Sequence, residues 1–509
     1  MFALGTFHHG FPSAYHPDEP AKVAQLVADT RDYHHPPLML TLADAVARAG
    51  GVAREPEALA RIGRTLSALY LAGAVAGLVV LAAIYGRTRA AVVTAAVALG
   101  LDAQAVLAAH FFKEDALFVL ALAGTFVAGA VHWRRRGTWD RLALGAAAGL
   151  AVSAKYVGAL AVVYALVLVM LAAGKKRRVQ GAECKSPGVG SRKPEAGKSG
   201  FAALHPAPCT LHFALSALAV VLLCNGAALR AHGAEIVAGW RLGVSTVQAG
   251  NGGVGARVPH LQFVGMLFLL TPLPILAGAA VFWADLRRFP FRAHADRWLA
   301  GLSPLWLTLV FSFSASTAAR YFLPVSLMMG CIAGVALPGA VRRLAGRSGR
   351  WSVPLARPFP AACLAAGLVA AFALPGTCSL LAGFAGDDRA ALTAWIEAHL
   401  PPDAVLAQDA LARLPADVHG RRVESAPVVA DLGDVAALRA RGVGYVVVCW
   451  YDSRRYTDPR KHASPDAHDF LRRREFYQGL PTHARSLWRS DLRQPFPLCP
   501  GLELFALDP

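Results

Sequence analysis

The sequence predicts an all-α polytopic membrane protein with a small α/β domain at its C-terminal end, and three observations support this fold class. Residues of the AVILMFWYC set fill 55% of the 509 positions, and charged residues fill only 17%, against about 25% in soluble proteins. The apolar residues are gathered in runs long enough to cross a membrane. Lys and Arg residues are concentrated in alternate connections between these runs, as in membrane proteins of fixed orientation.

The same composition excludes several other classes. A disordered chain or a collagen-like fibre would be poorer in apolar residues, and eight cysteines in 509 positions are too few for a small disulfide scaffold. A formal net charge of +18 would suggest a nucleic-acid partner for a soluble protein. In a membrane protein the basic excess has another cause, because cytoplasmic loops collect Lys and Arg. We therefore expect membrane lipids, and no nucleic acid, as partners.

Ten runs of roughly 20 mostly apolar residues are candidate membrane helices. The run 141–173 is too long for one crossing and has Lys155 in its middle, which predicts a hairpin of two helices that turns at Lys155. The ten candidate segments are 66–86, 89–109, 116–133, 141–154, 157–173, 211–229, 261–284, 298–314, 322–340 and 360–381.

The distribution of basic residues predicts the orientation. One alternate set of connections holds 23 Lys and Arg residues, and the other set of short connections holds six, namely Lys113, Lys155, Arg230, Arg241, Arg257 and Arg320. By the positive-inside rule the first set is cytoplasmic. The N-terminal segment and the C-terminal tail are then both extracytoplasmic, in a multi-pass protein of the cell inner (plasma) membrane. An outward N-terminus predicts a further helix before it, of which MFALGTF would be the end.

Four regions follow from these patterns. Residues 1–63 form an extracytoplasmic loop with juxtamembrane helices near 19–30 and 38–50, and residues 64–381 form the membrane core. Residues 174–200 are basic and rich in Gly, Ser and Pro, which is typical of a flexible cytoplasmic linker. Residues 382–509 are long enough for one small α/β domain. In that tail ALTAWIEAHL and HDFLRRREFY are predicted to be helices, and AVLAQ, GYVVVCW and LELFAL are predicted to be strands.

Polar residues that are costly near a membrane all fall on the predicted outer face, although they are up to about 300 positions apart in sequence. They are His16, Asp18, Glu19 and Lys22 in SAYHPDEPAK; His34 and His35 in DYHHPPL; Lys113, Glu114 and Asp115 in HFFKEDALF; Lys155; and Arg320 with Tyr321. This convergence predicts a functional site at the outer membrane interface.

A lipid-linked phosphate would suit such a site, since its tail holds the headgroup at the depth where these loops meet the helices. Lys113, Lys155 and Arg320 could neutralise the phosphate and the charge that grows on it as a leaving group. Asp18 could take the proton from an attacking hydroxyl. Simpler roles remain open: an Asp–Glu pair in a loop is often only solvated, and basic side chains near helix ends often extend to lipid headgroups.

Metal and cofactor use were also considered. His34 and His35 near acidic residues form a mixed N/O set, so a divalent metal held by His34 and Glu19 remains an open alternative, although no HxxxH or CxxC spacing is present. No phosphate-loop, GxGxxG or GxSxG motif occurs in the required context, so we expect no nucleotide cofactor. Cys449 and Cys499 both lie in the outward tail, and their spacing leaves open whether they pair.

Taken together and in order, YHPDEPAK, YHHPPL, HFFKEDALF, GLAVSAKY and ARYFLP resemble the motifs of GT-C membrane glycosyltransferases of the dolichyl-phosphate-mannose protein mannosyltransferase and aminoarabinose transferase superfamily. The resemblance covers about 1–380. It implies a transferase that takes a sugar from a polyprenyl-phosphate carrier on the outer side and passes it to an acceptor, usually with inversion. With the additional opening helix, the ten predicted crossings become eleven, which is similar to common members of that superfamily.

The resemblance carries over to single positions. The aspartate of the family's first-loop acidic motif, the catalytic base or acceptor contact, falls on Asp18, with Glu19 beside it, and the acidic residue before a later helix falls on Asp115. A Glu-Lys pair that serves metal and phosphate in the aminoarabinose branch falls on His34 and His35, which is a departure from that branch.

The sequence therefore predicts an integral-membrane hexosyl or pentosyl transferase of the cell envelope, acting on a protein, lipid or saccharide acceptor. The predicted catalytic residues are Asp18, Glu19 and Asp115, and the predicted donor-phosphate ligands are Lys113, Lys155, Arg320 and His35. Two other functions remain open. A secondary transporter would place its charges near mid-membrane on broken helices, and a non-catalytic flippase or scaffold subunit would use the tail to bind a partner.

Overall fold

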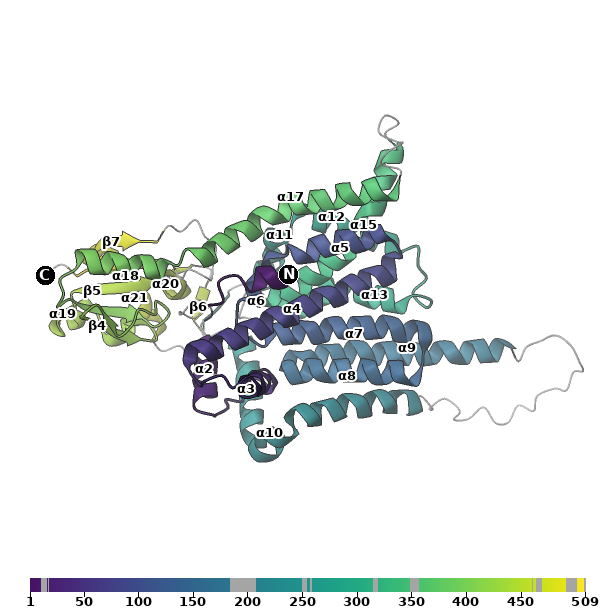
Figure 1. Ribbon diagram of the computed structural model, residues 1–509, viewed down its shortest axis with the longest axis horizontal. Coiled ribbons are helices and arrows are strands. Elements are labelled where there is room, and N and C mark those ends of the chain that lie inside the picture. Colours follow the sequence, from purple (N-terminus) through teal and green to yellow (C-terminus); the bar gives the residue numbers. More distant parts are fainter. Residues whose placement is uncertain are drawn as a thin grey trace, which may run out of the picture.

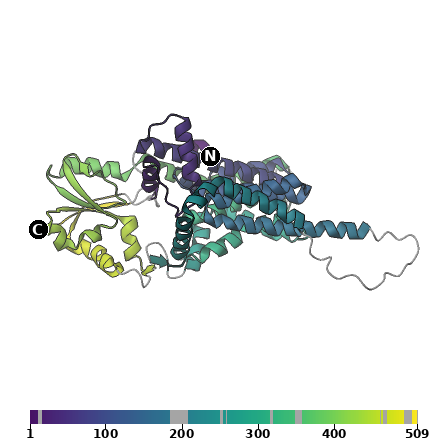
Figure 2. The same cartoon turned by 90° about the horizontal axis from the view of Figure 1, so that it is seen from below.

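Long helices run side by side to form a bundle, and an α/β domain lies at one end of it (Figure 1; Figure 2). The computed structural model describes residues 1–10, 16, 18–183, 207–249, 254–256, 259–314, 319–347, 357–459, 461–463, 469–490 and 501–507. The N-terminal segment lies near the same end of the bundle as the α/β domain. Segments that are distant in sequence therefore meet there.

All ten apolar runs are helical in the structure. By length and composition, six helices in the described parts of the chain can cross a membrane, or up to eight if each of two bent pairs is one span. The helices of the bundle are α4 (Pro56–Gly86), α5 (Arg89–Gly100), α6 (Ala103–Ala109), α7 (Asp115–Arg135), α8 (Thr138–Ala154), α9 (Ala159–Glu183), α10 (Ala207–Ala249), α11 (Pro259–Leu270), α12 (Leu273–Leu286), α13 (Ala295–Gly301), α14 (Ser303–Ser312), α15 (Leu323–Arg347) and α17 (Pro358–Ala385). The prediction of an all-α polytopic membrane protein is confirmed.

Three of the ten runs are broken rather than continuous helices. The run 89–109 bends by 55° between α5 and α6, where Asp102 Oδ1 accepts a hydrogen bond from Ala105 N at 2.8 Å and so caps α6. The run 261–284 bends by 109° between α11 and α12, at Pro272, which has no N–H to continue a helix. The run 298–314 is split into α13 and α14. Length and hydropathy cannot show such breaks, because they depend on single capping and proline residues.

The predicted hairpin turn at Lys155 is confirmed. Helix α8 ends at Ala154, Lys155 is extended (φ −158°, ψ 139°), and a short 3₁₀ turn, η1 (Tyr156–Gly158), leads into α9. A Cβ at Gly158 would lie 2.0 Å from the Ala151 carbonyl oxygen, so only glycine permits this close approach. The turn holds the Lys155 side chain at the end of the bundle that faces the α/β domain.

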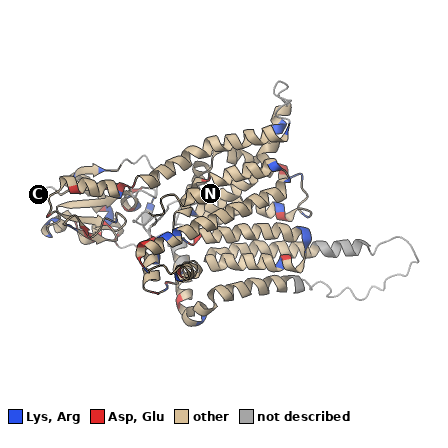
Figure 3. Cartoon of the chain, in the orientation of Figure 1, with Lys and Arg blue, Asp and Glu red and all other residues tan. Residues whose placement is uncertain are grey.

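Several Lys and Arg residues lie at the opposite end of the bundle (Figure 3). Ion pairs join helices there, including Arg134 with Asp296 at 3.0 Å and Arg343 with Asp285 at 3.0 Å. Helix α9 continues through the first part of the predicted linker 174–200, and residues 184–200 lie outside the described residues, as does Arg257. Acidic residues as well as basic residues therefore join the helices at this end.

The N-terminal segment forms three short helices. Helix α1 (Phe2–Gly5) contacts α4 and α6. Helices α2 (Glu19–Val27) and α3 (Leu38–Ala49) agree with the predicted juxtamembrane helices. Both α2 and α3 contact α4 of the bundle. They lie at the end of the bundle nearest the α/β domain (Figure 1), which brings the acidic motif before α2 to that end.

The C-terminal domain contains a six-stranded sheet in the order β3-β4-β2-β5-β8-β7. Strands β2, β4 and β5 are parallel, and the other pairs are antiparallel. Each predicted strand and helix of the tail is present. The elements are α18 (Asp388–His399), β2 (Val405–Asp409), β3 (Asp417–Val418), β4 (Arg421–Ala426), η3 (Val429–Leu432), α19 (Val435–Ala440), β5 (Tyr445–Cys449), α20 (Trp450–Thr457), α21 (Phe470–His483), β7 (Arg485–Arg489) and β8 (Leu502–Ala506).

Two apolar clusters form the core of this domain, one with α18 and the other with α19 and α21. A separate two-stranded sheet joins the domain to the bundle: β1 (Val254–Ala256), which follows α10, pairs antiparallel with β6 (Lys461–Ala463) of the tail. Cys449 is buried in the domain, and Cys499 lies outside the described residues, so their pairing stays a prediction.

Candidate functional site

The triplet Lys113–Glu114–Asp115 at the start of α7 is the centre of a buried charged cluster. Phe112, which is fully buried, precedes the triplet and packs on Gly63 of α4, where a Cβ would lie 2.2 Å from the phenyl ring. Glu114 is the N-cap residue of α7 and Asp115 is its first residue. Both carboxylates gain from the partial positive charge at a helix N-terminus. The packing of Phe112 thus fixes three consecutive charged side chains at the end of the bundle.

Each member of the triplet forms an ion pair with a different segment. Lys113 pairs with Asp18 of the acidic loop, and Asp115 pairs with Lys155 of the hairpin turn. Glu114 lies 2.7 Å from Lys22 Nζ of α2, and its other carboxylate oxygen lies 3.0 Å from His35 Nε2. The structure therefore brings together most of the residues that the sequence predicts to meet, and it does so from four separate segments.

Arg320 approaches the same cluster from the segment directly before α15. It lies in η2 (Ala319–Phe322), and its Nη1 is 3.1 Å from His16 Nε2. Arg320 and Lys155 both lie beside the ring of Tyr321, at 5.3 and 5.4 Å from its centroid. The carboxylates of Asp115 and Asp18 lie close enough to stabilise the positive charge of Arg320.

His16 links Arg320 to the acidic loop. Its ring is buried, and Nδ1 lies 3.1 Å from the backbone N of Asp18. Burial, with the nearby Lys113 and Arg320, holds the pKa of His16 well below its usual value. The ring is therefore neutral and carries one proton, so it can accept a hydrogen bond from only one of its two neighbouring donors.

Asp18 is the most accessible acid of the cluster, with its side chain 44% exposed, whereas Glu114 is 1% exposed. Burial by itself would raise the pKa of Asp18, but the charges of Lys113 and Arg320 outweigh this effect and hold the pKa below its usual value. Burial would also raise the pKa of Glu114, but His35, Lys22 and Lys113 have the larger effect and hold this pKa well below its usual value. Both groups are carboxylates at neutral pH, and Asp18 is the one that a substrate can reach.

Glu19 lies in a different environment from Asp18. Its carboxylate pairs with Arg64 of α4 at 2.7 Å, and both side chains are only 1% exposed. Arg64 also donates to the His9 carbonyl oxygen at 3.0 Å. Because Glu19 is enclosed by this pair, the geometry favours a role in anchoring α2 to α4, one residue away from Asp18.

The residues proposed for a metal do not form a donor set. Glu19 is committed to Arg64, while His34 stacks against His35 with ring centroids 4.6 Å apart. In the part of the chain that the structure describes, no group of three or more His, Cys, Asp or Glu residues is arranged to hold a metal ion. The geometry gives His34 and Glu19 no support as a pair of ligands.

Four contributors were absent from the predicted site residues. Glu114 and Lys22 lie in the motifs HFFKEDALF and SAYHPDEPAK. The sequence does not show that these two residues form an ion pair with each other. Arg64 lies just before the apolar run 66–86, in a turn that also holds Arg61, so the sequence alone does not single it out. Arg413 of the tail, which donates to the His16 carbonyl oxygen at 3.1 Å, lies in no recognisable motif, and no sequence signal identifies it.

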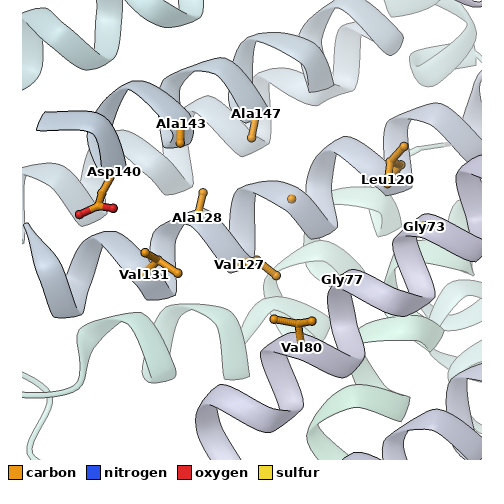
Figure 4. A pocket seen from close by; sticks show the side chains of 11 residues that line it. Gly73, Gly77, Val80, Leu120, Val127, Ala128, Val131, Asp140, Ala143 and Ala147 are labelled. Carbon is orange, nitrogen blue, oxygen red and sulfur yellow. The ribbon is translucent and has the colours of Figure 1, made fainter. Parts of the chain in front are cut away.

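A cavity of about 440 Å³ lies elsewhere, between α4, α7 and α8 (Figure 4). Small residues such as Gly73, Gly77, Gly124 and Ala128 line it, and Asp140 is its only charged residue. None of the residues of the charged cluster lines this cavity. Its apolar wall suits hydrocarbon rather than polar chemistry, so the cavity is separate from the candidate site.

Comparisons with known proteins agree with this architecture. Residues 57–184 match the family described as dolichyl-phosphate-mannose-protein mannosyltransferase. A search of curated proteins found no match.

Two crystal structures of ArnT from Cupriavidus metallidurans are similar along almost the whole chain. The structure bound to undecaprenyl phosphate has a TM-score of 0.54 and 13% sequence identity. The apo structure has a TM-score of 0.53 and 14% identity. Each match covers 99% of this chain and 96% of the other. At such low identity the similarity shows a shared fold.

Proposed function

We propose that the chain is a member of the GT-C superfamily of membrane glycosyltransferases, and that it transfers a sugar from a polyprenyl-phosphate carrier to an extracytoplasmic acceptor. The observation that carries this proposal is the cluster around Lys113, Glu114 and Asp115, where a half-exposed carboxylate, Asp18, lies beside several cations. The ArnT structure that shares the fold was crystallised with undecaprenyl phosphate, which supports the carrier class. The acceptor is a protein, a lipid or an envelope glycan.

The charged cluster faces the outside of the membrane in this proposal. The Lys- and Arg-rich end of the bundle is opposite the α/β domain (Figure 3), and the positive-inside rule assigns that end to the cytoplasm. A carrier lipid whose tail lies along the bundle would present its phosphate at the level of the cluster. The charges lie at the end of the bundle rather than at mid-depth, which disfavours a transporter.

Lys113, Lys155 and Arg320 would bind the carrier phosphate. Lys113 and Lys155 are 3% and 13% exposed, so they are shielded from bulk water, where charge-assisted hydrogen bonds are strong. Negative charge grows on the phosphate as it leaves, and cations already in place stabilise that charge without reorganisation. Asp115 holds Lys155 in position through their ion pair. Glu114, which contacts both Lys22 and His35, holds the N-terminal segment in position.

The transfer would be a single displacement. The acceptor oxygen forms a bond to the anomeric carbon of the sugar while the bond from that carbon to the phosphate oxygen breaks, and the electron pair leaves with the phosphate. The hydroxyl proton passes to the Asp18 carboxylate. Attack on the face opposite the phosphate inverts the anomeric centre. Asp18 can serve as the base although its pKa is low. The acceptor hydroxyl becomes strongly acidic as its oxygen forms the new bond to the anomeric carbon, so even a weak base can take its proton.

The pH dependence of kcat/KM tests the state of the free enzyme. The pKa of Asp18 is below its usual value because the neighbouring cations outweigh burial, so Asp18 is already a carboxylate at pH 5. The pKa of Lys113 is lowered by burial and by Arg320, so activity should fall at a pH below the usual lysine value. We expect a profile from pH 5 to 10 that is flat on the acid side and declines only on the alkaline side. A loss of activity between pH 7 and 6 would contradict this assignment.

The function itself is tested with purified protein in liposomes and a panel of undecaprenyl-phosphate hexoses and pentoses. We expect at least one donor to release undecaprenyl phosphate, detected by mass spectrometry, together with a glycosylated product when envelope lipids, glycans or proteins are added. Uptake of a labelled solute without any carrier lipid would favour a transporter. Turnover that requires a second protein would favour a flippase or scaffold subunit.

A further inference from the structure

A loop of the C-terminal domain reaches the acidic loop of the bundle. Arg413 follows β2, and its Nη2 donates to the carbonyl oxygen of His16 at 3.1 Å, across 397 sequence positions. The same carbonyl oxygen accepts from Glu19 N at 3.0 Å, in the turn that starts α2. This contact therefore lies two residues from Asp18, on the backbone that places it.

The tail fixes Arg413 in a strained conformation. Its φ of 56° lies in the left-handed region, which costs energy for any residue with a Cβ. Buried Gln408 holds the next residue on both sides: its amide nitrogen donates to the Leu414 carbonyl oxygen at 2.8 Å, and its amide oxygen accepts from Leu414 N at 2.9 Å. Local strain that the surrounding structure maintains is a feature of functional sites.

The side chain of His16, whose carbonyl oxygen Arg413 contacts, lies beside two residues of the proposed active site. The His16 ring lies 3.1 Å from Asp18 N and 3.1 Å from Arg320 Nη1, so a shift of the His16 backbone would move a ring that touches both. The β1–β6 pair is a second link between the tail and the bundle. Two separate segments of the bundle are thus held by the same domain.

We propose that Arg413 is a positioning residue that fixes the acidic loop at His16, so that the C-terminal domain is part of the catalytic unit. The measurement of kcat that tests this inference rests on the proposed function. The measurement of hydrogen exchange does not depend on it. Arg413 holds the loop and does not touch the sugar.

Arg413→Gly separates positioning from stability. Glycine adopts a positive φ without strain, so the melting temperature should stay unchanged or rise, while the bond to His16 is lost. We expect kcat to fall about 10- to 100-fold, as a misplacement of roughly 1 Å at a reacting group does, with a KM for the donor close to that of the wild type. Arg413→Lys retains a donor and should recover part of the rate. Arg439→Ala removes another tail arginine that donates to a backbone carbonyl, at 3.2 Å from the His483 oxygen, and should behave as wild type.

Hydrogen exchange gives a readout that needs no activity. In Arg413→Gly the amides of residues 18–27 should exchange faster than in the wild type, while those of β2 and β5 should not change. An unchanged exchange rate in residues 18–27, or a kcat equal to that of the wild type, would overturn the proposal. If the wild type transfers no sugar from any donor, the proposed function fails, and the exchange measurement still decides the role of Arg413.

Discussion

Asp18→Asn is expected to lower kcat by about 10²- to 10⁴-fold while the protein stays folded, because the amide cannot accept the hydroxyl proton. The amide has nearly the same shape, and the side chain is 44% exposed, so little packing is lost. Lys113 loses its counter-ion in this variant and is released to the carrier phosphate. The KM for the donor should therefore stay the same or fall, which can be measured by the rate of undecaprenyl phosphate release at varied donor concentrations.

Asp29→Asn is a suitable control for the same chemical change. The Asp29 side chain is 57% exposed and pairs with Arg31, Arg48 and Arg54 at 3.3 to 3.8 Å, and its φ of 54° is well tolerated by Asn. This variant should transfer sugar at the wild-type rate. An Asp18→Asn protein that is folded and as active as the Asp29→Asn control would remove Asp18 from the mechanism.

Arg64→Met is expected to destabilise the protein by about 3–5 kcal/mol, because it leaves the Glu19 carboxylate buried without its partner. Both side chains of this pair are only 1% exposed, at 2.7 Å from each other. The double variant Arg64→Met with Glu19→Gln removes both charges and should recover a large part of this loss. Thermal unfolding in detergent, followed for all four proteins, gives the coupling energy directly.

Arg48→Met provides the contrast for an exposed ion pair. Arg48 is 60% exposed and pairs with Asp44 of α3, and ion pairs that water can screen contribute little to stability. If Arg64→Met destabilised the protein no more than Arg48→Met does, the pair with Glu19 would not anchor α2. If the double variant were as unstable as the sum of the single variants, the two side chains would act independently.

The sequence predicted the parts of this molecule that depend on local pattern. Apolar runs identified the helices because a membrane imposes a minimum length on them. Lys155 marked the hairpin turn, since a lysine is costly in the middle of a span. The alternating basic connections placed the HPDE, KED and Arg320 motifs at one end, and the ion pairs Lys113–Asp18 and Asp115–Lys155 join residues from these motifs.

The remainder depends on tertiary contacts that no local pattern records. The bend between α5 and α6 follows from one cap, Asp102, and the split of the 298–314 run was not visible in its hydropathy. Glu19 looked equivalent to Asp18 in sequence, but Arg64, 45 positions away, encloses it. Arg413 meets His16 across almost the whole chain, so neither spacing nor composition could connect them.

The three neighbouring charges at the start of α7 also limit how the gene can change in length. Each of them is matched to a different part of the chain, and successive helical residues differ in direction by roughly 100°. One codon added within the first turn of α7 would rotate the triplet relative to the remainder of that helix and separate all three matches at once. Insertions should therefore be excluded from this turn even where single substitutions are tolerated.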